Sequence, residues 1–143
     1  MESLQIVTAA DKQDVVLIHR FLSQESAWAK GIPFETVRES VSSSLNFGGL
    51  IGASQIAYAR VVSDYATFAY LLDVFVLPEH RGRGYSAQLM AAVMAHPRLQ
   101  GLRRFMLHTS TAHRLYAKYG FTPPARPEIL MERFIPNAYG HGL

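Results

Sequence analysis

Two arginines and two glycines follow a long apolar run in the middle of the chain, and their spacing indicates an anion-binding turn. Gly82 and Gly84 let backbone N–H groups converge without a Cβ in the way. Arg81 and Arg83 add positive charge at the same point. A helix that begins near Ser86 would supply unsatisfied N–H groups and a positive dipole end. The pattern predicts a phosphate site, although an ordinary strand-to-helix turn with surface arginines fits this stretch equally well.

Two common nucleotide-binding motifs do not match this turn. A Walker loop requires G-x-x-x-x-G-K-[ST], and a dinucleotide-binding fold requires G-x-G-x-x-G after an early strand. The turn reads R-G-R-G-Y-S, so the sequence favours neither NTP hydrolysis nor NAD binding.

Three titratable side chains are candidates for acid–base chemistry. Asp73 is a carboxylate inside an apolar run, where it would be a base, a group that binds a cationic amine, or a structural acceptor. His108 ends a short apolar run and changes its charge near neutral pH, which makes it a second candidate for a base. Tyr116 lies on the apolar stripe of a short helix, where core packing is the simplest interpretation of the residues alone. The chain has no cysteine, which excludes thiolate metal sites and a cysteine nucleophile, and no metal is expected.

The first half of the chain must position these groups with one strand, two helices and the start of a sheet. We expect a strand over residues 4–7, then a helix capped by Asp11. Pro33 is expected to open a second helix that continues to Asn46 and is stopped by Gly48 and Gly49. Short β-branched and aromatic runs at residues 50–54, 55–62 and 67–77 predict three neighbouring antiparallel strands.

The second half continues with a helix over residues 86–96, a strand over 105–108, a short helix that Gly120 terminates, and a last strand over 129–134. The order β-α-α-β-β-β-α-β-α-β predicts an α/β (α+β) fold with a mixed, mostly antiparallel sheet flanked by helices.

Composition sets the wider limits. The chain has 143 residues, of which 49% are apolar and 17% charged, which predicts a single globular domain over residues 1–143. Neither a secretory signal nor a membrane-spanning stretch is recognisable, so we expect a cytoplasmic protein with no membrane partner. The net charge of +3 favours a small anionic ligand over nucleic acid.

Two segments in order resemble the GNAT acetyltransferase superfamily. The turn is similar to the acetyl-CoA signature R-x-x-G-x-G/A through Arg81, Gly84 and Ser86, with serine in place of the usual glycine or alanine. Residues 109–121, TSTAHRLYAKYGF, resemble N-x-x-A-x-x-[LF]-Y-x-x-x-G-F. Thr109 stands where asparagine is common, and Tyr116 matches. Each motif alone is weak, but the ordered pair is specific, and with the element order the resemblance covers residues 4–134.

The resemblance implies acetyl transfer from acetyl-CoA to a primary amine of a small molecule or peptide, by direct attack in a ternary complex. It implies that Tyr116 is the general acid and that the N–H of Val76 stabilises the oxyanion. Acetyl-CoA would contact Val74, Phe75, Val76, Arg81, Gly82, Arg83, Gly84, Tyr85 and Ser86.

The acceptor pocket implied by the resemblance is built from residues 23–33 and from the loop around Asp64. Glu25, Trp28 and Tyr65 would form an amphipathic wall for a cationic or aromatic amine. A Trp28 that only covers the core fits equally well.

The alternative function is a CoA-binding sensor or interaction module that keeps the fold without useful catalysis. Members of the family often dimerise, so a homodimer is one expected state.

Overall fold

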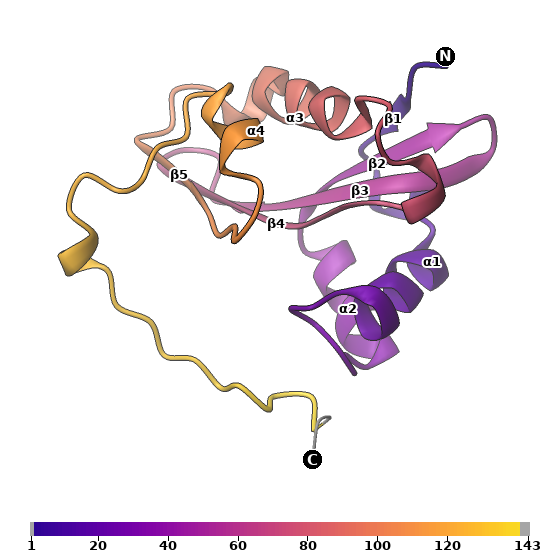
Figure 1. Ribbon diagram of the computed structural model, residues 1–143, viewed down its shortest axis with the longest axis horizontal. Coiled ribbons are helices and arrows are strands. Elements are labelled where there is room, and N and C mark those ends of the chain that lie inside the picture. The colour runs from indigo at the N-terminus through magenta and orange to yellow at the C-terminus, as the bar shows by residue number, and fades with distance from the viewer. Residues whose placement is uncertain (1, 141–143) are drawn as a thin grey trace.

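The computed structural model of the chain describes residues 2–140, and its centre is a five-stranded sheet (Figure 1). The strands follow the sheet in sequence order as β1 Gln5–Val7, β2 Leu45–Ile51, β3 Ser54–Ser63, β4 Phe68–Val76 and β5 Arg104–Leu107. Neighbours from β1 to β4 are antiparallel, whereas β4 and β5 are parallel. The expected mixed, mostly antiparallel sheet is confirmed.

Helices cover both faces of the sheet (Figure 1). One face carries α1 Val15–Arg20 and α2 Phe34–Ser42, joined by a π-helical turn Phe21–Glu25 and a loop. The other face carries α3 Tyr85–Ala95 and α4 His113–Ala117. Each face has its own apolar cluster, one built around α1 and α2 and one around α3. No helix within residues 2–140 has the length and apolar character that crossing a membrane requires.

The first helix begins later than expected. Residues Ala10–Lys12 form only a 3-10 turn, and α1 is capped by Asp14, whose Oδ1 accepts the Leu17 N–H at 3.0 Å. The expectation that Asp11 caps this helix is therefore wrong. Asp14 is the better cap because the chain at Gln13 is still extended and turns into the helix one residue later.

Strand β2 also begins earlier than expected, because α2 ends at Ser42. Gly48 and Gly49 do not terminate a helix but lie inside the strand. A Cβ at Gly48 would lie 2.4 Å from Oε1 of Gln13, and one at Gly49 would lie 2.9 Å from Cδ1 of Leu4. Both glycines are thus required by close packing against β2 rather than by a turn.

Strand β4 contains a β-bulge at Asp73. Leu72 pairs with Arg60 and Phe75 pairs with Tyr58, so two residues of β4 oppose one residue of β3. Asp73 has φ of 55°, a left-handed conformation that costs a non-glycine residue about 1–2 kcal/mol. The extra residue changes which face of the sheet successive side chains occupy.

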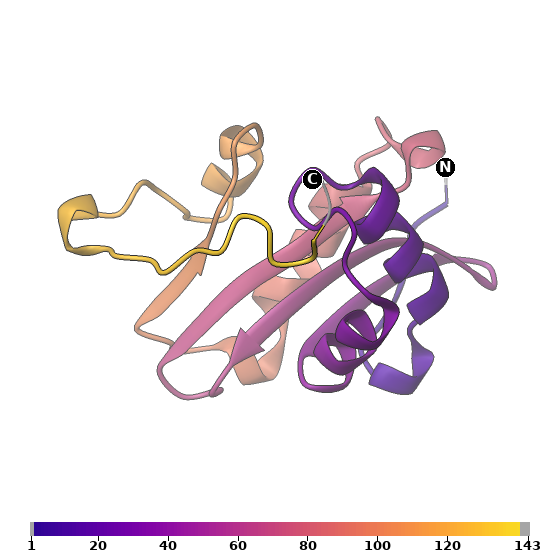
Figure 2. The same ribbon diagram turned by 90° about the horizontal axis from the view of Figure 1, so that it is seen from below.

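Strand β5 pairs along its whole length, but only with the first half of β4. The pairing joins Phe68–Leu71 to Arg104–Leu107, and β4 continues alone to Val76. Figure 2 shows β5 diverging from β4. The separation leaves backbone groups of β4 free on this side.

The last expected strand, over residues 129–134, is not formed. Every residue from Thr122 to Gly140 is exposed, and Pro127–Ile129 is a 3-10 turn. The apolar sequence was suited to a strand, but a strand also needs a neighbour to satisfy its backbone, and this segment runs away from β5 (Figure 1).

Candidate active site

A cavity of about 660 Å³ opens where β4 and β5 separate. Its lining comes from three distant parts of the sequence, namely the loop before α2, the middle of β4, and the segment from β5 to α4. The side chains that line it and carry polar groups or aromatic rings are Trp28, Tyr70, Asp73, His108, Thr109 and Tyr116.

The cavity passes through the sheet rather than lying on one face. Tyr70 pairs with Val62 and with Met106, which places it on the face that α1 and α2 cover, with His108 two residues after Met106 on the same face. Tyr116 belongs to the apolar cluster of the opposite face. Side chains from both faces of the sheet therefore line the same cavity.

The end of β4 presents its backbone to this gap. The Leu77 N–H donates to the Ile56 carbonyl at 2.8 Å, so the next pair, Ala57 and Val76, is of the non-hydrogen-bonded kind in an antiparallel ladder. The N–H and C=O of Val76 therefore point away from β3. The carbonyl accepts from Nε of Arg81 at 2.9 Å, and the N–H faces the side where β5 has diverged.

The glycine turn continues directly from this strand end. Gly82 and Gly84 have φ of 78° and 80°, and a Cβ built at either meets no atom within 4 Å. The glycines are thus needed for their left-handed backbone, and the space beside them is open. The first intrahelical bond of α3 runs from Gln88 N–H to Gly84 C=O at 3.2 Å, which leaves the first-turn N–H groups of α3 free for an anion.

Several residues of this segment contribute backbone rather than side chain. The ring of Phe75 stacks on Phe21 with centroids 4.0 Å apart, within the α1/α2 cluster. Tyr85 is buried and its hydroxyl donates to the Glu2 carbonyl at 2.9 Å. Arg83 is exposed beside the turn. The turn therefore offers free backbone N–H groups and the Arg83 side chain, which are groups that bind phosphate.

Tyr116 is 8% exposed and faces the cavity from α4. Burial raises the pKa of its hydroxyl above the usual value of 10, so the hydroxyl keeps its proton at physiological pH. Among residues 2–140, no fully buried side-chain oxygen or nitrogen lacks a hydrogen-bond partner, and the structure gives the Tyr116 hydroxyl none. The oxygen is therefore reached from the cavity.

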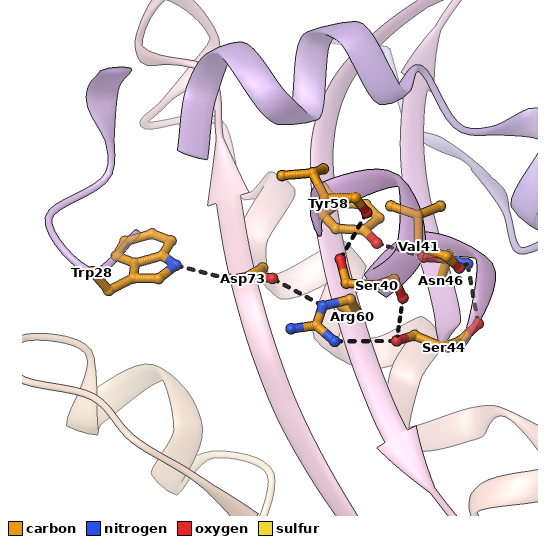
Figure 3. Close-up of polar contacts among 9 residues, drawn as sticks. Trp28, Ser40, Val41, Ser44, Asn46, Tyr58, Arg60 and Asp73 are labelled. Carbon is orange, nitrogen blue, oxygen red and sulfur yellow. Dashed lines mark hydrogen bonds and ion pairs between the residues drawn. The ribbon is translucent and has the colours of Figure 1, made fainter. Parts of the chain in front are cut away.

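Asp73 holds a polar network together (Figure 3). Its Oδ1 accepts from Nε1 of Trp28 at 2.8 Å, and its Oδ2 accepts from Nε of Arg60 at 2.9 Å. Arg60 also donates through Nη1 to Oγ of Ser44 at 3.1 Å. The side chains of Arg60 and Asp73 are only 15% and 9% exposed. Both carboxylate oxygens are occupied, and the indole of Trp28 is fixed at the edge of the cavity.

His108 and Tyr70 form a second polar pair at the cavity. The Tyr70 hydroxyl and Nδ1 of His108 are hydrogen-bonded. Burial raises the pKa of Tyr70, and Glu132 adds to this effect. Sequence reasoning did not single out Tyr70. Reading β4 and β5 as parallel neighbours would have found it, because parallel strands bring Tyr70 beside the end of β5.

A family model described as an acetyltransferase (GNAT) domain matches residues 46–123, more than half of the chain.

The chain belongs to the GNAT acetyltransferase family.

Relatives of this GNAT protein agree with that assignment. A crystal structure from Xanthomonas campestris pv. campestris, assigned to the GNAT family of acetyltransferases, is 61% identical, covers 97% of this chain and 98% of its own, and superposes with a TM-score of 0.94. The protein FG08082 of Gibberella zeae, assigned as an acetyltransferase, is 30% identical over 71% of this chain and 68% of its own length.

A more distant structure shares the GNAT fold. It is a protein from Clostridium acetobutylicum that was assigned as an acetyltransferase and solved with acetyl-CoA. The two sequences are 14% identical, and the structures superpose with a TM-score of 0.66 over 92% of this chain and 96% of the other.

The GNAT protein does not bring all the expected acceptor residues together. Trp28 lines the cavity, but Tyr65 lies in the turn between β3 and β4, where the Arg98 guanidinium covers its ring at 3.6 Å. Glu25 ends the π-helical turn and is exposed, away from the cavity lining. The expected wall of Glu25, Trp28 and Tyr65 is therefore not formed, because the β3–β4 turn lies at the opposite end of β4 from the bulge.

Thr109, at the motif position where asparagine is common, has a structural role in this GNAT protein. Its Oγ1 accepts the Ala112 N–H at 2.9 Å and so shapes the turn that leads into α4. The threonine side chain is short enough for its hydroxyl to bond the backbone three residues later, and Tyr116 of α4 still lines the cavity.

Proposed function

We propose that this protein transfers an acetyl group from acetyl-CoA to a primary amine by direct attack in a ternary complex. The observation that carries the proposal is the cavity through the sheet, with Tyr116 reaching it from one face and Tyr70 and His108 from the other. Two substrates that enter from opposite sides would meet between β4 and β5.

The residues present fit acetyl-CoA. The free N–H groups at the start of α3, the open space at Gly82 and Gly84, and exposed Arg83 would hold its phosphates. When bound, acetyl-CoA supplies the acetyl group as an activated thioester. The Val76 N–H, which points away from β3, would donate to the carbonyl oxygen as negative charge develops there.

The acceptor amine must lose a proton before it attacks. An amine with a pKa of about 10.4 is neutral at pH 7 in roughly one molecule in 2,500, which costs about 4.6 kcal/mol. We assign the base to His108. If its Nδ1–H donates to the Tyr70 oxygen, then Nε2 keeps a lone pair and accepts the proton. Asp73 is a positioning residue in this mechanism, because both its oxygens already accept hydrogen bonds.

Tyr116 donates a proton to the departing sulfur as general acid, and its phenolate takes up the second proton that the attacking nitrogen loses as the amide forms. Its raised pKa keeps the proton in place until the thiolate forms. The position of Tyr116 on the α3 and α4 face, where it lines the same cavity as Val74 of β4, supports this role.

The acceptor that suits the cavity is an amine with an aromatic or aliphatic body. Trp28 and Tyr70 supply rings, Leu72 and Leu107 supply apolar surface, and the Asp73 carboxylate is already paired with Arg60. The binding energy would come from ring contacts, including a cation–π contact with the ammonium form.

The proposal is tested first by calorimetric titration with acetyl-CoA, CoA and ATP. We expect micromolar binding of both CoA species and much weaker binding of ATP. Absence of CoA binding would refute the assignment of the turn. Amines with and without aromatic rings are then compared by thiol release. Binding without turnover of any amine would favour the CoA-binding sensor.

The base is tested with H108Q and Y70F. Both should lower kcat/KM and alter its acidic limb while leaving acetyl-CoA affinity unchanged. H113Q is the matched control, since His113 is exposed on α4 and lies outside the cavity lining. An unchanged pH profile in H108Q would remove this residue from the mechanism.

A further inference from the structure

The indole of Trp28 lies at the edge of the cavity and is held there by a single polar contact. The backbone of its loop is fixed by buried Ser26, whose Oγ accepts the Ala29 N–H at 3.0 Å and donates to the Leu22 carbonyl at 2.6 Å. Trp28 itself is 55% exposed, and within residues 2–140 its indole makes one hydrogen bond, from Nε1 to Oδ1 of Asp73. The orientation of this ring therefore depends on where the Asp73 carboxylate points.

The carboxylate of Asp73 is oriented in turn by Arg60. Asp73 lies at the bulge, where the pairing of β4 with β3 is interrupted, and its Oδ2 accepts from Nε of Arg60 at 2.9 Å. An apolar pair of similar volume often stabilises a buried place as well as an ion pair does. Stability alone therefore gives no reason for two charges here. The bond to Trp28 does, because an apolar side chain at this position could not accept it.

Arg60 has a fixed place at the C-terminal end of α2. Its Nη1 donates to Oγ of Ser44 at 3.1 Å, and the Ser44 hydroxyl donates to the Ser40 carbonyl at 2.6 Å. The next carbonyl, of Val41, accepts from Nδ2 of buried Asn46 at 2.9 Å. The C-terminal end of a helix also carries a partial negative charge that favours a guanidinium. The end of α2 thus holds Arg60 independently of the carboxylate.

We propose that Arg60 and Ser44 are positioning residues for the acceptor amine, and that they act through Asp73 on Trp28. The inference rests on the proposed function, because it names what holds the ring that faces the acceptor. Neither Arg60 nor Ser44 lines the cavity, so their effect reaches the amine through the network that ends at Trp28 (Figure 3). Acceptor affinity therefore depends on the junction between α2 and β2 as well as on the cavity lining.

Fluorescence tests the network directly, because Trp28 is the only tryptophan of the chain. R60K keeps the charge but lacks the planar fork that holds two partners in fixed directions. S44A keeps Arg60 and removes its second partner. In both variants we expect Trp28 to lose emission anisotropy and to be quenched more readily by acrylamide than in the parent.

S42A is the matched control for S44A. The Ser42 hydroxyl donates to the Glu39 carbonyl of the same helix at 2.9 Å, but makes no contact with Arg60. Both serine variants lose one hydrogen bond to a carbonyl of α2, so a merely structural role would change the Trp28 signal alike in both. A parent-like signal in S44A or in R60K overturns the proposal, and so does an equal change in S42A. Circular dichroism verifies that the variants are folded.

Kinetics with phenethylamine as the acceptor test the link to the amine. The KM for phenethylamine should rise about threefold in S44A and about tenfold in R60K, with kcat and acetyl-CoA affinity unchanged. An unchanged KM, or a lower kcat at unchanged KM, overturns the proposal. In a W28F background S44A should have no further effect, and a full threefold rise there would show that Ser44 acts by another route. The fluorescence comparison uses the free protein, so failure of the proposed acetyl transfer and failure of this network are distinguishable.

Discussion

Replacing Asp73 tests the claim that this residue positions others rather than transferring protons. In D73A the Arg60 guanidinium, 15% exposed, loses its charged partner and keeps the 3.1 Å contact with Ser44. Removing one partner of a buried ion pair costs about 3–5 kcal/mol of stability. Because Arg60 keeps its contact with Ser44 and is partly exposed, we expect D73A to lose about 3 kcal/mol, the lower end of this range. D73N keeps one acceptor and tolerates a left-handed backbone, so we expect a loss of about 1.5–2 kcal/mol.

Thermal unfolding measures these losses. In a chain of this size, the Tm falls by roughly 3 °C for each kcal/mol of stability that is lost. We therefore expect a Tm lower by about 9 °C in D73A and about 5 °C in D73N. D73G separates strain from pairing. It loses the same contacts as D73A but relieves the left-handed strain of about 1–2 kcal/mol, so its Tm should lie above that of D73A.

Kinetics then decide the role. Loss of the Trp28 anchor should raise the acceptor KM several-fold in D73N, with the shape of the pH profile of kcat/KM unchanged. If D73N instead lowers kcat by a hundredfold or more and removes the acidic limb, then Asp73 is the base and the assignment to His108 is wrong. A D73A protein as stable as the parent would refute the energetic reasoning.

Three further changes have defined outcomes. Y116F should lower kcat by about a hundredfold and leave acetyl-CoA affinity unchanged, as measured by rate assays and calorimetry. Because burial raises the pKa of Tyr116, any alkaline limb of the pH–rate profile that is due to its ionisation should lie above pH 10 in the parent and vanish in the variant. G84V should weaken acetyl-CoA binding by calorimetry and lower stability by about 1–2 kcal/mol through its φ of 80°, and unimpaired affinity would contradict the turn assignment. G48A should cost about 1–2 kcal/mol in urea unfolding, since the new Cβ meets the hydrogen-bonded Gln13 side chain, and an unchanged midpoint would show that Gln13 moves aside freely.

The parts of the fold that the sequence predicted well are those fixed by local chemistry. The run before the glycine turn, the turn itself and the helix after it each depend on residues within a few positions. The positive φ of Gly82, Gly84 and Gly120 confirms the backbone that the sequence required there. The order of the elements up to α4 followed from the same local patterns.

The errors arose where distant contacts decide the structure. Gly48 and Gly49 look like helix stops, but the side chains that require them, Gln13 and Leu4, are far away in sequence. Tyr65 was expected near Trp28 because the family resemblance implied an acceptor pocket built from both loops, but Tyr65 packs against Arg98 in the β3–β4 turn and Trp28 is bonded to Asp73. Residues 129–134 have strand character, but no local pattern states whether a neighbouring strand is within reach.

The bulge at Asp73 has a consequence for how β4 tolerates change. Before it, even-numbered residues such as Tyr70 and Leu72 share the face of α1 and α2, whereas after it odd-numbered Phe75 occupies that face. Deleting one residue at the bulge would restore one-to-one pairing and leave Phe75 opposite Tyr58 on the same face, but it would remove the left-handed residue from β4. A one-residue deletion elsewhere in β4 would instead reverse the faces of the residues on one side of it. The length of this strand is therefore under stricter constraint than its composition, and variation in acceptor preference should proceed by substitution at residues 70–72 rather than by insertion or deletion.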